Sequence, residues 1–470
     1  MSNSQKANPK ASNMYLLAML ADVNARMLWK TAQEAKQESE EWAYSHIQQA
    51  MNDAQGLLKN AVPSWKKYNW KVDNGWKPTV TIGETTAYFF KYYYVNNLIY
   101  LAKGVDPTNG KTIYVVSIAG TNGVSKQDWW TEDFAVKRLV NWDAKNHAFD
   151  IGFDEEDSMN NTNVKTQKKV AQGTLNGFND LNSLKRGNQT IFRYLESQIG
   201  DNPGNFEIIV TGHSLGGTLS PVYALSLKEK APDWNVSFFA FAGATPGNQA
   251  FADYTAQTLG ENQMHSFWNK MDIVPHAWDH AHMAALENIY VPCIGSGHSL
   301  LLNKVLEYFT ELAQDNYARF DAKSYSSFNN AKICITIDDK VLDSIVGGIG
   351  RAHDNLRHIR FRKAINLLCG LDPMLGAWRN AKPFVEHFCK YLLEALGQHV
   401  QPYFYNFVEN DAKLFEEFIQ AYFYAKNIPD VLKEFVDRGD EILLFKVLKR
   451  IINTVAFDKA LQQLQEKELV

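Results

Sequence analysis

The chain has 470 residues, of which 45% are hydrophobic, 13% aromatic and 21% charged. This composition is typical of globular proteins and excludes collagen-like, mucin-like and wholly disordered chains. The formal net charge of −4 gives no electrostatic argument for a nucleic-acid partner. The length allows two or three domains, or one large α/β domain with helical additions.

The first apolar segment of the chain spans residues 14–21 and follows Lys6 and Lys10. It has some features of a signal-peptide core, but apolar residues continue beyond it at helical spacing, as at Val23 and Met27. We therefore expect an amphipathic helix here, within a helical segment that covers residues 12–61. Without a signal peptide, the expected location is cytoplasmic, or outside the cell by an export route that needs no such peptide.

Residues 68–118 change to a β-strand pattern, with β-branched and aromatic runs that end at Gly, Asn or Pro. The runs predict strands at 79–82, 87–95 and 113–118, and Asn109-Gly110 predicts a hairpin turn. Residues 143–166 are polar and acidic, which is typical of a long surface loop. Residues 187–200 have the pattern of a helix.

The next region alternates strand and helix patterns. Strands are predicted at 206–211, 236–242 and 264–268, and helices at 219–230 and 249–259. Alternation of this kind indicates parallel strands joined by crossover helices, so the fold class is α/β with a mostly parallel sheet. Beyond about residue 300 the pattern is mostly helical, with one strand at 333–337 and two or three amphipathic helices in 404–470.

Four cysteines stand at positions 293, 334, 369 and 389, and no two of them form a Cys-x-x-Cys pair. This spacing excludes a zinc knuckle and a thioredoxin motif. Buried free thiols are the expected state, and the sequence leaves one or two disulfide bridges open. No apolar run approaches the 18 to 20 residues of a membrane-spanning helix.

The strongest chemical signal is Gly212-His-Ser-Leu-Gly216, which fits the pattern Gly-x-Ser-x-Gly. It directly follows the predicted strand 206–211 and precedes a predicted helix, which is the setting of a nucleophile elbow. The small glycines let the backbone turn sharply, so the hydroxyl of Ser214 projects from the end of the strand. The helix that follows leaves the backbone N–H of Leu215 available to an oxyanion.

These residues resemble the lipase class 3 family of α/β-hydrolases, and three further blocks match in order over about residues 80–280. The first is residues 114–121, followed by Asp128-Trp-Trp-Thr-Glu-Asp133, where the resemblance makes Thr121 an oxyanion-hole donor. The family often has Arg before the preceding glycine, but Ala119 stands there. The second is residues 239–248. The third is Asn269-Lys-Met-Asp-Ile-Val-Pro275, which places the acid of a catalytic triad at Asp272, with Asp279 as the alternative.

The triad histidine follows the acid in chain order. The candidates are His276, His280, His282, His298, His353, His358, His387 and His399. The family's histidine often stands in a His-x-x-x-Tyr context, and His387 with Tyr391 fits it, so His387 is expected to be the base. His298, which follows a flexible Gly-Ser-Gly loop, is the second candidate. His213 is expected to pack or hydrogen-bond beside the elbow.

A lipid substrate needs an apolar site protected from water, and the resemblance places a mobile lid at about residues 134–168. An ordinary surface loop is the alternative. Residues 442–455 are apolar with interspersed Lys and Arg, which suits either a packed helix or a helix on a membrane surface.

The resemblance thus implies an α/β-hydrolase fold with helical N- and C-terminal extensions. The expected division is a helical segment at 1–67, a catalytic domain at 68–400 with a helical insertion at about 296–380, and a helical extension at 401–470. The expected reaction is hydrolysis of acylglycerol esters through an acyl-enzyme, with no metal and no organic cofactor. The expected partners are a lipid or other ester substrate and a transient lipid interface. The sequence leaves open a phospholipase A, an acyltransferase, and a non-catalytic interaction module.

Overall fold

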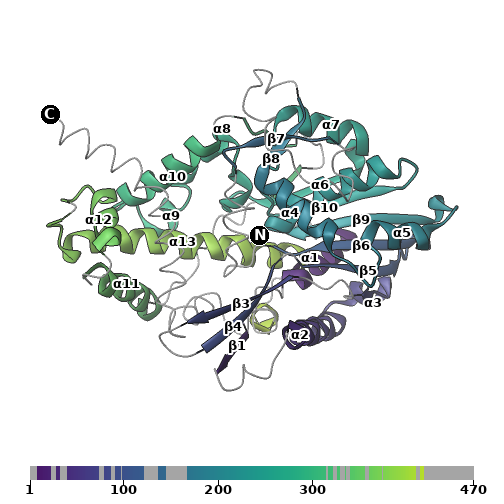
Figure 1. Cartoon of the computed structure of the whole chain (residues 1–470), viewed down its shortest axis with the longest axis horizontal. Coiled ribbons are helices and arrows are strands. Elements are labelled where there is room, and N and C mark those ends of the chain that lie inside the picture. The colour runs from purple at the N-terminus through teal and green to yellow at the C-terminus, as the bar shows by residue number, and fades with distance from the viewer. Residues whose placement is uncertain are drawn as a thin grey trace, which may run out of the picture.

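Within the described residues, seven strands form a central sheet with helices on both faces (Figure 1). The strand order is β12-β11-β10-β9-β6-β5-β2. In chain order the strands are β2 (Lys71–Asp73), β5 (Ile99–Val105), β6 (Thr112–Ile118), β9 (Phe206–His213), β10 (Val236–Phe241), β11 (Met264–Asn269) and β12 (Tyr325–Phe328). The strands from β6 to β12 run parallel, whereas β5 and β2 are antiparallel to their neighbours. The expected mostly parallel sheet is confirmed.

The computed structural model of this protein describes residues 8–22, 28–31, 40–73, 79–85, 90–96, 98–120, 136–143, 167–313, 316–320, 325–328, 334, 339–354, 359–372, 374–408 and 413–417.

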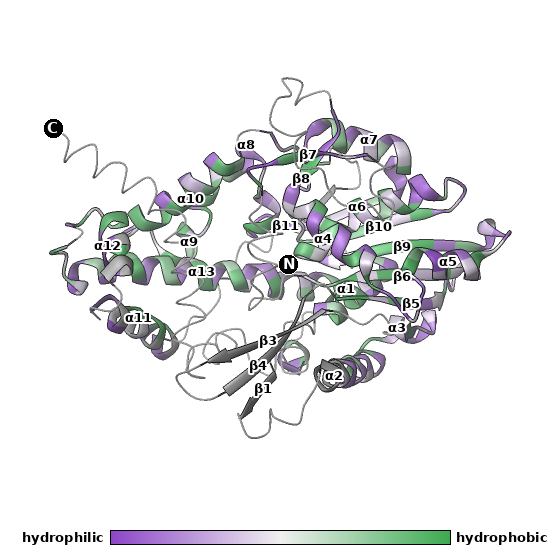
Figure 2. Ribbon diagram, viewed as in Figure 1, coloured by the Kyte–Doolittle hydropathy of each residue, from purple (hydrophilic) through white to green (hydrophobic). Residues whose placement is uncertain are grey.

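The central strands are buried on both sides, which is why their sequences are continuous apolar runs. The side chain of Ile209 in β9 joins the core on one face, and those of Ile208 and Val210 join the core on the other. Figure 2 shows β6 and β9 as mostly hydrophobic ribbons. Between β5 and β6 the turn at Asn109-Gly110 forms as expected, with Gly110 at φ 72°.

Four helices cover one face of the sheet: α4 (Gln172–Ser183), α5 (Ile191–Ile199), α6 (Leu215–Lys230) and α7 (Gln249–Leu259). The helices predicted at 219–230 and 249–259 correspond to α6 and α7. The helix predicted at 187–200 begins later, because Thr190 caps α5 with its side chain.

The other face is covered by α1 (Pro9–Ala21), α2 (Glu40–Ala61), α3 (Pro63–Tyr68) and the C-terminal part of α13 (Trp378–Phe407). The prediction of one helix over 12–61 is wrong, since the short strand β1 (Leu28–Thr31) lies between α1 and α2. The helix at residues 14–21 is confirmed, but it is not amphipathic. Every residue from Ala11 to Ala21 is buried, because α1 packs between the sheet and its neighbouring helices.

The remaining strands form two small sheets. β1, β3 (Thr79–Thr85) and β4 (Phe90–Asn96) pair as β1-β4-β3, and β7 (Leu139–Asn141) pairs with β8 (Lys169–Ala171). The strand predicted at 333–337 lies outside the described residues except for Cys334, and the nearby strand is β12.

Helices dominate the described part of the chain after β11, and from about residue 300 onward they were expected. They are α8 (His280–Met283), α9 (Val291–Ile294), α10 (Leu300–Ala313), α11 (Asp339–Asp354), α12 (Ile359–Leu368) and α13. Short 3-10 helices span Pro203–Asn205, Glu261–Gln263, Val274–His276 and Leu286–Asn288. Figure 1 shows α13 running from α11 and α12 back to the sheet.

One disulfide joins Cys293 of α9 to Cys334, whereas Cys369 and Cys389 are free and buried. The expectation of free thiols is therefore wrong for the first pair. The division expected at residue 400 falls inside α13, and α1 shares one core with Phe404 and Phe239. The helices expected beyond residue 417 lie outside the described residues. Within the described part of the chain, no helix combines the length and apolarity that crossing a membrane requires.

Candidate active site

Ser214 occupies a sharp turn between β9 and α6, as the Gly-x-Ser-x-Gly pattern predicts. Its backbone has φ 58° and ψ −124°, a strained conformation for a residue with a side chain. The turn requires glycine on both sides. A Cβ atom on Gly212 would collide with the backbone of Gly216, and one on Gly216 would collide with the carbonyl group of Ile118.

The end of β6 lies directly beside this turn. A Cβ atom on Gly120 would stand 3.2 Å from the Cβ of Ser214. Thr121, which the resemblance makes an oxyanion donor, lies outside the described residues. Leu215 is the first residue of α6, where backbone N–H groups have no acceptor within the helix.

Asp272 follows β11 and is completely buried. Its Oδ1 accepts a hydrogen bond from the N–H of Val274 at 3.0 Å. Its Oδ2 lies 2.8 Å from Nδ1 of His399 and also accepts a hydrogen bond from the hydroxyl of Tyr403 at 2.8 Å. A buried carboxylate must be paired and hydrogen-bonded, and these three contacts provide that pairing.

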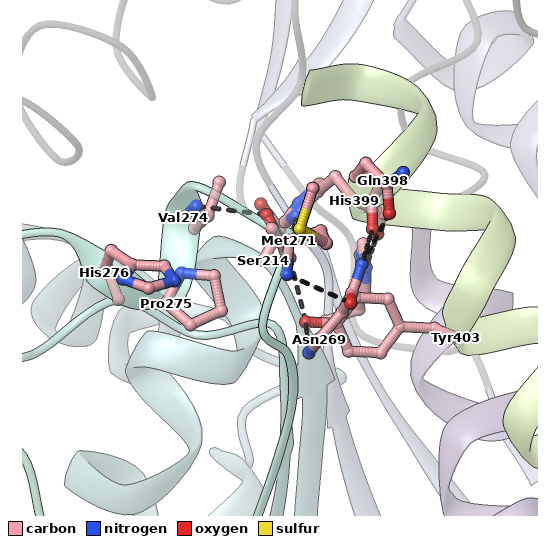
Figure 3. Close-up of polar contacts among 12 residues, drawn as sticks. Ser214, Asn269, Met271, Val274, Pro275, His276, Gln398, His399 and Tyr403 are labelled. Atoms are coloured by element: carbon pink, nitrogen blue, oxygen red, sulfur yellow. Dashed lines mark hydrogen bonds and ion pairs between the residues drawn. The ribbon is translucent and has the colours of Figure 1, made fainter. Parts of the chain in front are cut away.

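His399 comes from α13 and is the histidine that Asp272 contacts. Because its Nδ1 is held by the carboxylate, a neutral ring carries its proton on Nδ1 and leaves Nε2 as an acceptor. Nε2 is buried and has no hydrogen-bond partner within the described part of the chain. Figure 3 shows His399, Gln398 and Tyr403 reaching from α13 toward the loop that holds Asn269 and Met271, with Ser214 in the same close-up.

The structure corrects the expectation that Asp272 orients His387. His387 lies on the same helix but roughly 18 Å before His399 along the helix axis, at 1.5 Å per residue. It is buried, and its neighbours Val385 and Phe388 on α13 belong to a core with residues of α10 and α11. Burial, His298 and Lys390 together lower the pKa of His387.

The second candidates for the base and the acid have other partners. His298 is exposed, and its ring contacts Phe384 at 5.1 Å, near His387. Asp279 caps α8: its Oδ1 accepts a hydrogen bond from the N–H of His282 at 3.3 Å and lies 3.0 Å from Nδ1 of the same residue. His213 hydrogen-bonds beside the elbow, as expected.

Asn269 fixes the loop that carries Asp272 against α13. Its side-chain N–H₂ group donates to the carbonyl oxygen and the Oε1 of Gln398, at 3.1 and 2.9 Å. Its backbone N–H donates to the hydroxyl of Tyr403 at 3.0 Å, and its Oδ1 accepts from the N–H of Met271 at 3.1 Å. The residues on both sides of His399 are therefore anchored to the strand end that precedes Asp272.

A signal for His399 is present in the sequence. The spacing His-x-x-x-Tyr occurs twice in α13, as His387 with Tyr391 and as His399 with Tyr403. The hydroxyl of Tyr391 donates to the carbonyl oxygen of Leu286, whereas that of Tyr403 donates to Asp272. Only the second pair contacts Asp272, because the C-terminal part of α13 is the part that packs on the sheet.

Most of the expected lid lies outside the described residues, as does the helix expected at 442–455. Of the lid region, residues 136–143 and 167–168 are described. Val136 is buried and its carbonyl oxygen accepts a hydrogen bond from Tyr317 at 2.6 Å. Trp142 is buried against Phe178 and Phe251.

Residues 115–280 match the model of the lipase (class 3) family, which confirms the resemblance over that segment. A "Lipase" of Rhizopus niveus is 33% identical over 101 residues, which are 20% of this chain and 24% of that one. The "Secreted mono- and diacylglycerol lipase A" of Penicillium cyclopium is 33% identical over 97 residues, 20% of this chain and 31% of that one. The matches cover less than a third of either relative.

A solved structure covers more of the chain. The crystal structure of M37 lipase has a TM-score of 0.53 and 21% identity, and the match covers 89% of this chain and 100% of that one. At this identity the likeness shows the fold, and the expected α/β-hydrolase fold is confirmed.

Proposed function

We propose that this chain, whose residues 115–280 match the lipase (class 3) family, is a serine hydrolase that cleaves acylglycerol esters through an acyl-enzyme. The observation that carries the proposal is the buried contact of 2.8 Å between Asp272 and Nδ1 of His399. It leaves Nε2 of that histidine without a partner among the described residues. Asp272 follows β11 and Ser214 follows β9, so both lie at the carboxyl end of the parallel strands.

In the proposed reaction, Ser214 attacks the acyl carbonyl carbon and His399 takes the serine proton at Nε2. Asp272 keeps the ring in the required tautomer and stabilises the imidazolium that forms. The C–O bond to the alcohol then breaks, and His399 returns the proton to the leaving oxygen. Water, activated by the same histidine, attacks the acyl-enzyme, and the acid leaves with Ser214 restored.

The tetrahedral intermediate carries a negative oxygen that needs donors. The N–H of Leu215 is the proposed donor from α6, with the positive end of that helix behind it. The proposed second donor is Thr121, which follows Gly120 at the end of β6.

The test is covalent labelling with a fluorophosphonate, with the modified peptide identified by mass spectrometry. The variants are Ser214→Ala, His399→Ala and, as a matched control on the same helix, His387→Gln. We expect labelling of Ser214 in the wild type and in the control, and none in the other two. The kcat for a soluble ester should fall by about 10³-fold or more in both unlabelled variants.

Labelling that survives in His399→Ala but disappears in His387→Gln would contradict the proposed triad. Equal hydrolysis by Ser214→Ala and the wild type would refute the proposed chemistry altogether. Diacylglycerol, triacylglycerol and phosphatidylcholine, offered in parallel, test the substrate. A preference for phosphatidylcholine would replace the acylglycerol lipase by a phospholipase, and acyl transfer to added alcohol in excess of hydrolysis would indicate an acyltransferase.

The proposed location is an oxidising compartment, because a disulfide such as Cys293–Cys334 persists where thiols are not kept reduced. A lipid substrate also implies transient contact with a lipid surface. Alkylation of the unfolded, unreduced protein from its native source should modify Cys369 and Cys389 but not the other two. Alkylation of all four would argue for a reducing location.

A further inference from the structure

A second Asp–His pair lies beside the first. Nδ1 of His213 is 3.2 Å from Oδ2 of Asp22, and both side chains are nearly buried, with 3% and 10% exposed. Asp22 ends α1, whereas His213 ends β9 immediately before the nucleophile. Nothing in the proposed reaction uses this pair.

The second ring nitrogen of His213 contacts the base directly. Its Nε2 lies 2.9 Å from the backbone carbonyl oxygen of His399, and the two imidazole rings lie 4.6 Å apart, centre to centre. A carboxylate and a carbonyl oxygen can only accept hydrogen bonds. Both ring nitrogens of His213 must therefore donate, which requires the imidazolium form.

The placement of Asp22 also points to a cationic partner. Asp22 stands at the C-terminal end of a helix, where the partial negative charge of the helix disfavours a carboxylate. A buried carboxylate in this position needs a positive charge next to it. The imidazolium of His213 supplies that charge.

Asp22 has a second contact that reaches the other side of the site. Its Oδ1 accepts a hydrogen bond from the N–H of Gly120 at 2.6 Å. Gly120 directly precedes Thr121 and lies against Ser214. One carboxylate thus holds the end of β6 and, through His213, the turn of α13 that carries the base.

We propose that Asp22 and imidazolium His213 are positioning residues, which fix the backbone of His399 and the end of β6 in the geometry that ester hydrolysis needs. This inference rests on the proposed function of Ser214 and His399. Neither residue of the pair exchanges a proton with substrate.

The surroundings of His213 determine how its charge depends on pH. The groups that face it are Asp22 and Tyr15 from α1, His399 and Tyr403 from α13, and Asp272 from the loop after β11. Burial disfavours the charged ring, but the hydrogen bond and charge of Asp22, helped by the His399 carbonyl and Asp272, raise the pKa of His213 overall.

Because the pKa is higher in the folded protein, the imidazolium stabilises the fold fully below the ordinary value of about 6.5, and this stabilisation is lost as the pH rises through the raised value. The Nε2 donation to the His399 carbonyl is lost over the same range. We therefore expect kcat to fall at alkaline pH as His213 loses its proton.

The test combines two variants with two readouts. Asp22→Asn keeps an acceptor for Gly120 but removes the anion, and His213→Gln keeps a donor without charge. We expect kcat to fall on the order of 10- to 100-fold in each, with little change in KM, because the base is misplaced while the substrate site persists. The double variant should be no worse than the single ones, since both act through one pair.

The pH dependence of kcat and the NMR spectra distinguish a positioning role of the pair from a general loss of structural stability. In Asp22→Asn the alkaline fall of kcat should begin at lower pH than in the wild type. With ¹⁵N-labelled histidine, His213 should show two ring N–H protons in the wild type, identified by their absence in His213→Gln. In Asp22→Asn their loss should occur at lower pH.

The matched control is Glu207→Gln. It removes the ion pair of 2.6 Å between Lys10 and Glu207, which also ties α1 to β9 but lies outside the site. Wild-type kcat, KM and pH profile are expected in this variant. Equal losses in the control would reduce Asp22 to a general anchor of α1 and overturn the proposal.

The inference and the proposed function fail in different ways. If Ser214→Ala and His399→Ala abolish hydrolysis while Asp22→Asn and His213→Gln keep wild-type kcat and pH profile, only the positioning role is refuted. A neutral His213 in the NMR spectra at pH 6 would refute it independently of any activity. Retained hydrolysis in Ser214→Ala would refute the proposed function itself.

Discussion

Tyr403 and His399 share one oxygen atom of Asp272, each at 2.8 Å. Burial and the charge of Asp272 raise the pKa of Tyr403 well above its ordinary value, so the hydroxyl keeps its proton and acts as a donor. The carboxylate therefore has a second fixed donor besides His399.

Replacing Tyr403 by Phe removes this donor and leaves the ring packed. We expect a lower kcat, by roughly tenfold, because Asp272 loses one of its fixed contacts and orients the base less well. The free energy of unfolding should fall by about 1.5–3 kcal/mol, as for a hydrogen bond to a charged group. Ester kinetics and urea unfolding measure the two effects.

Tyr405→Phe is the control for this substitution, since its hydroxyl accepts a hydrogen bond from Gln401 away from the acid. It should leave kcat unchanged. Equal kinetic effects in the two variants would show that the contact with Asp272 has no part in orienting the base.

The residues of the site differ in how far local sequence determines them. Ser214 and Leu215 follow from a turn whose steric demands are local, and Asp272 from a strand end. His399 does not, because two histidines of α13 have the same spacing to a tyrosine. Only the packing of that helix against the sheet decides between them, and it depends on residues far away in the chain.

At the scale of secondary structure, α1 is the helix whose apolar composition follows most directly from its packing. From Met14 to Ala21 its residues are apolar on every side, because the sheet, α2, α3 and α13 enclose it. The hydroxyls of Ser117 and Tyr100 both donate to the backbone carbonyl oxygen of Leu17, at 2.8 and 2.5 Å, which fixes the position of α1 on the strands.

Leu17→Ala should therefore be costly. The side chain is fully buried, and truncating a buried leucine destabilises proteins by about 2–5 kcal/mol through lost burial and a residual cavity. Chemical denaturation should show a lower midpoint with an unchanged slope. Asn52→Ala on the exposed side of α2 is the control and should change stability by less than about 0.5 kcal/mol. Equal midpoints for the two variants would mean that α1 is not part of the cooperative core.

Helices and strands with strong periodicity, such as α7 and β9, could be predicted almost to the residue. The segment 12–61 could not, because its helical pattern hides a strand whose partner, β4, lies far along the chain. Pairing with a distant strand overrides local helix propensity, and it cannot be predicted from the residues next to the strand alone.

At the scale of the molecule, the disulfide between Cys293 and Cys334 closes a loop with a sequence separation of 41. The chain-entropy model gives about 4 kcal/mol of stabilisation for a loop of this length. Reduction should lower the thermal midpoint accordingly, as measured by calorimetry with and without dithiothreitol. Cys293→Ser should melt at the temperature of the reduced wild type, with no further effect of the reductant. A further fall on reduction of that variant would show that the reductant acts elsewhere.

The class of the fold could be predicted because alternating strands and helices leave few arrangements. The contribution of α1 and α13 to the site could not be predicted. Asp22 and His399 meet at His213 only after α1 and α13 have both docked on the same face of the sheet. Neither helix contains a sequence pattern that predicts this contact.

The position of α13 in the chain has a consequence for biosynthesis. Proteins emerge from the ribosome N-terminus first, so Ser214 and Asp272 are exposed to the cell long before His399 is translated. In the proposed mechanism, Ser214 has no base until that helix docks, so the nascent polypeptide is expected to be inert toward esters. If the proposed triad is correct, the order of translation delays ester hydrolysis until α13 has docked on the sheet.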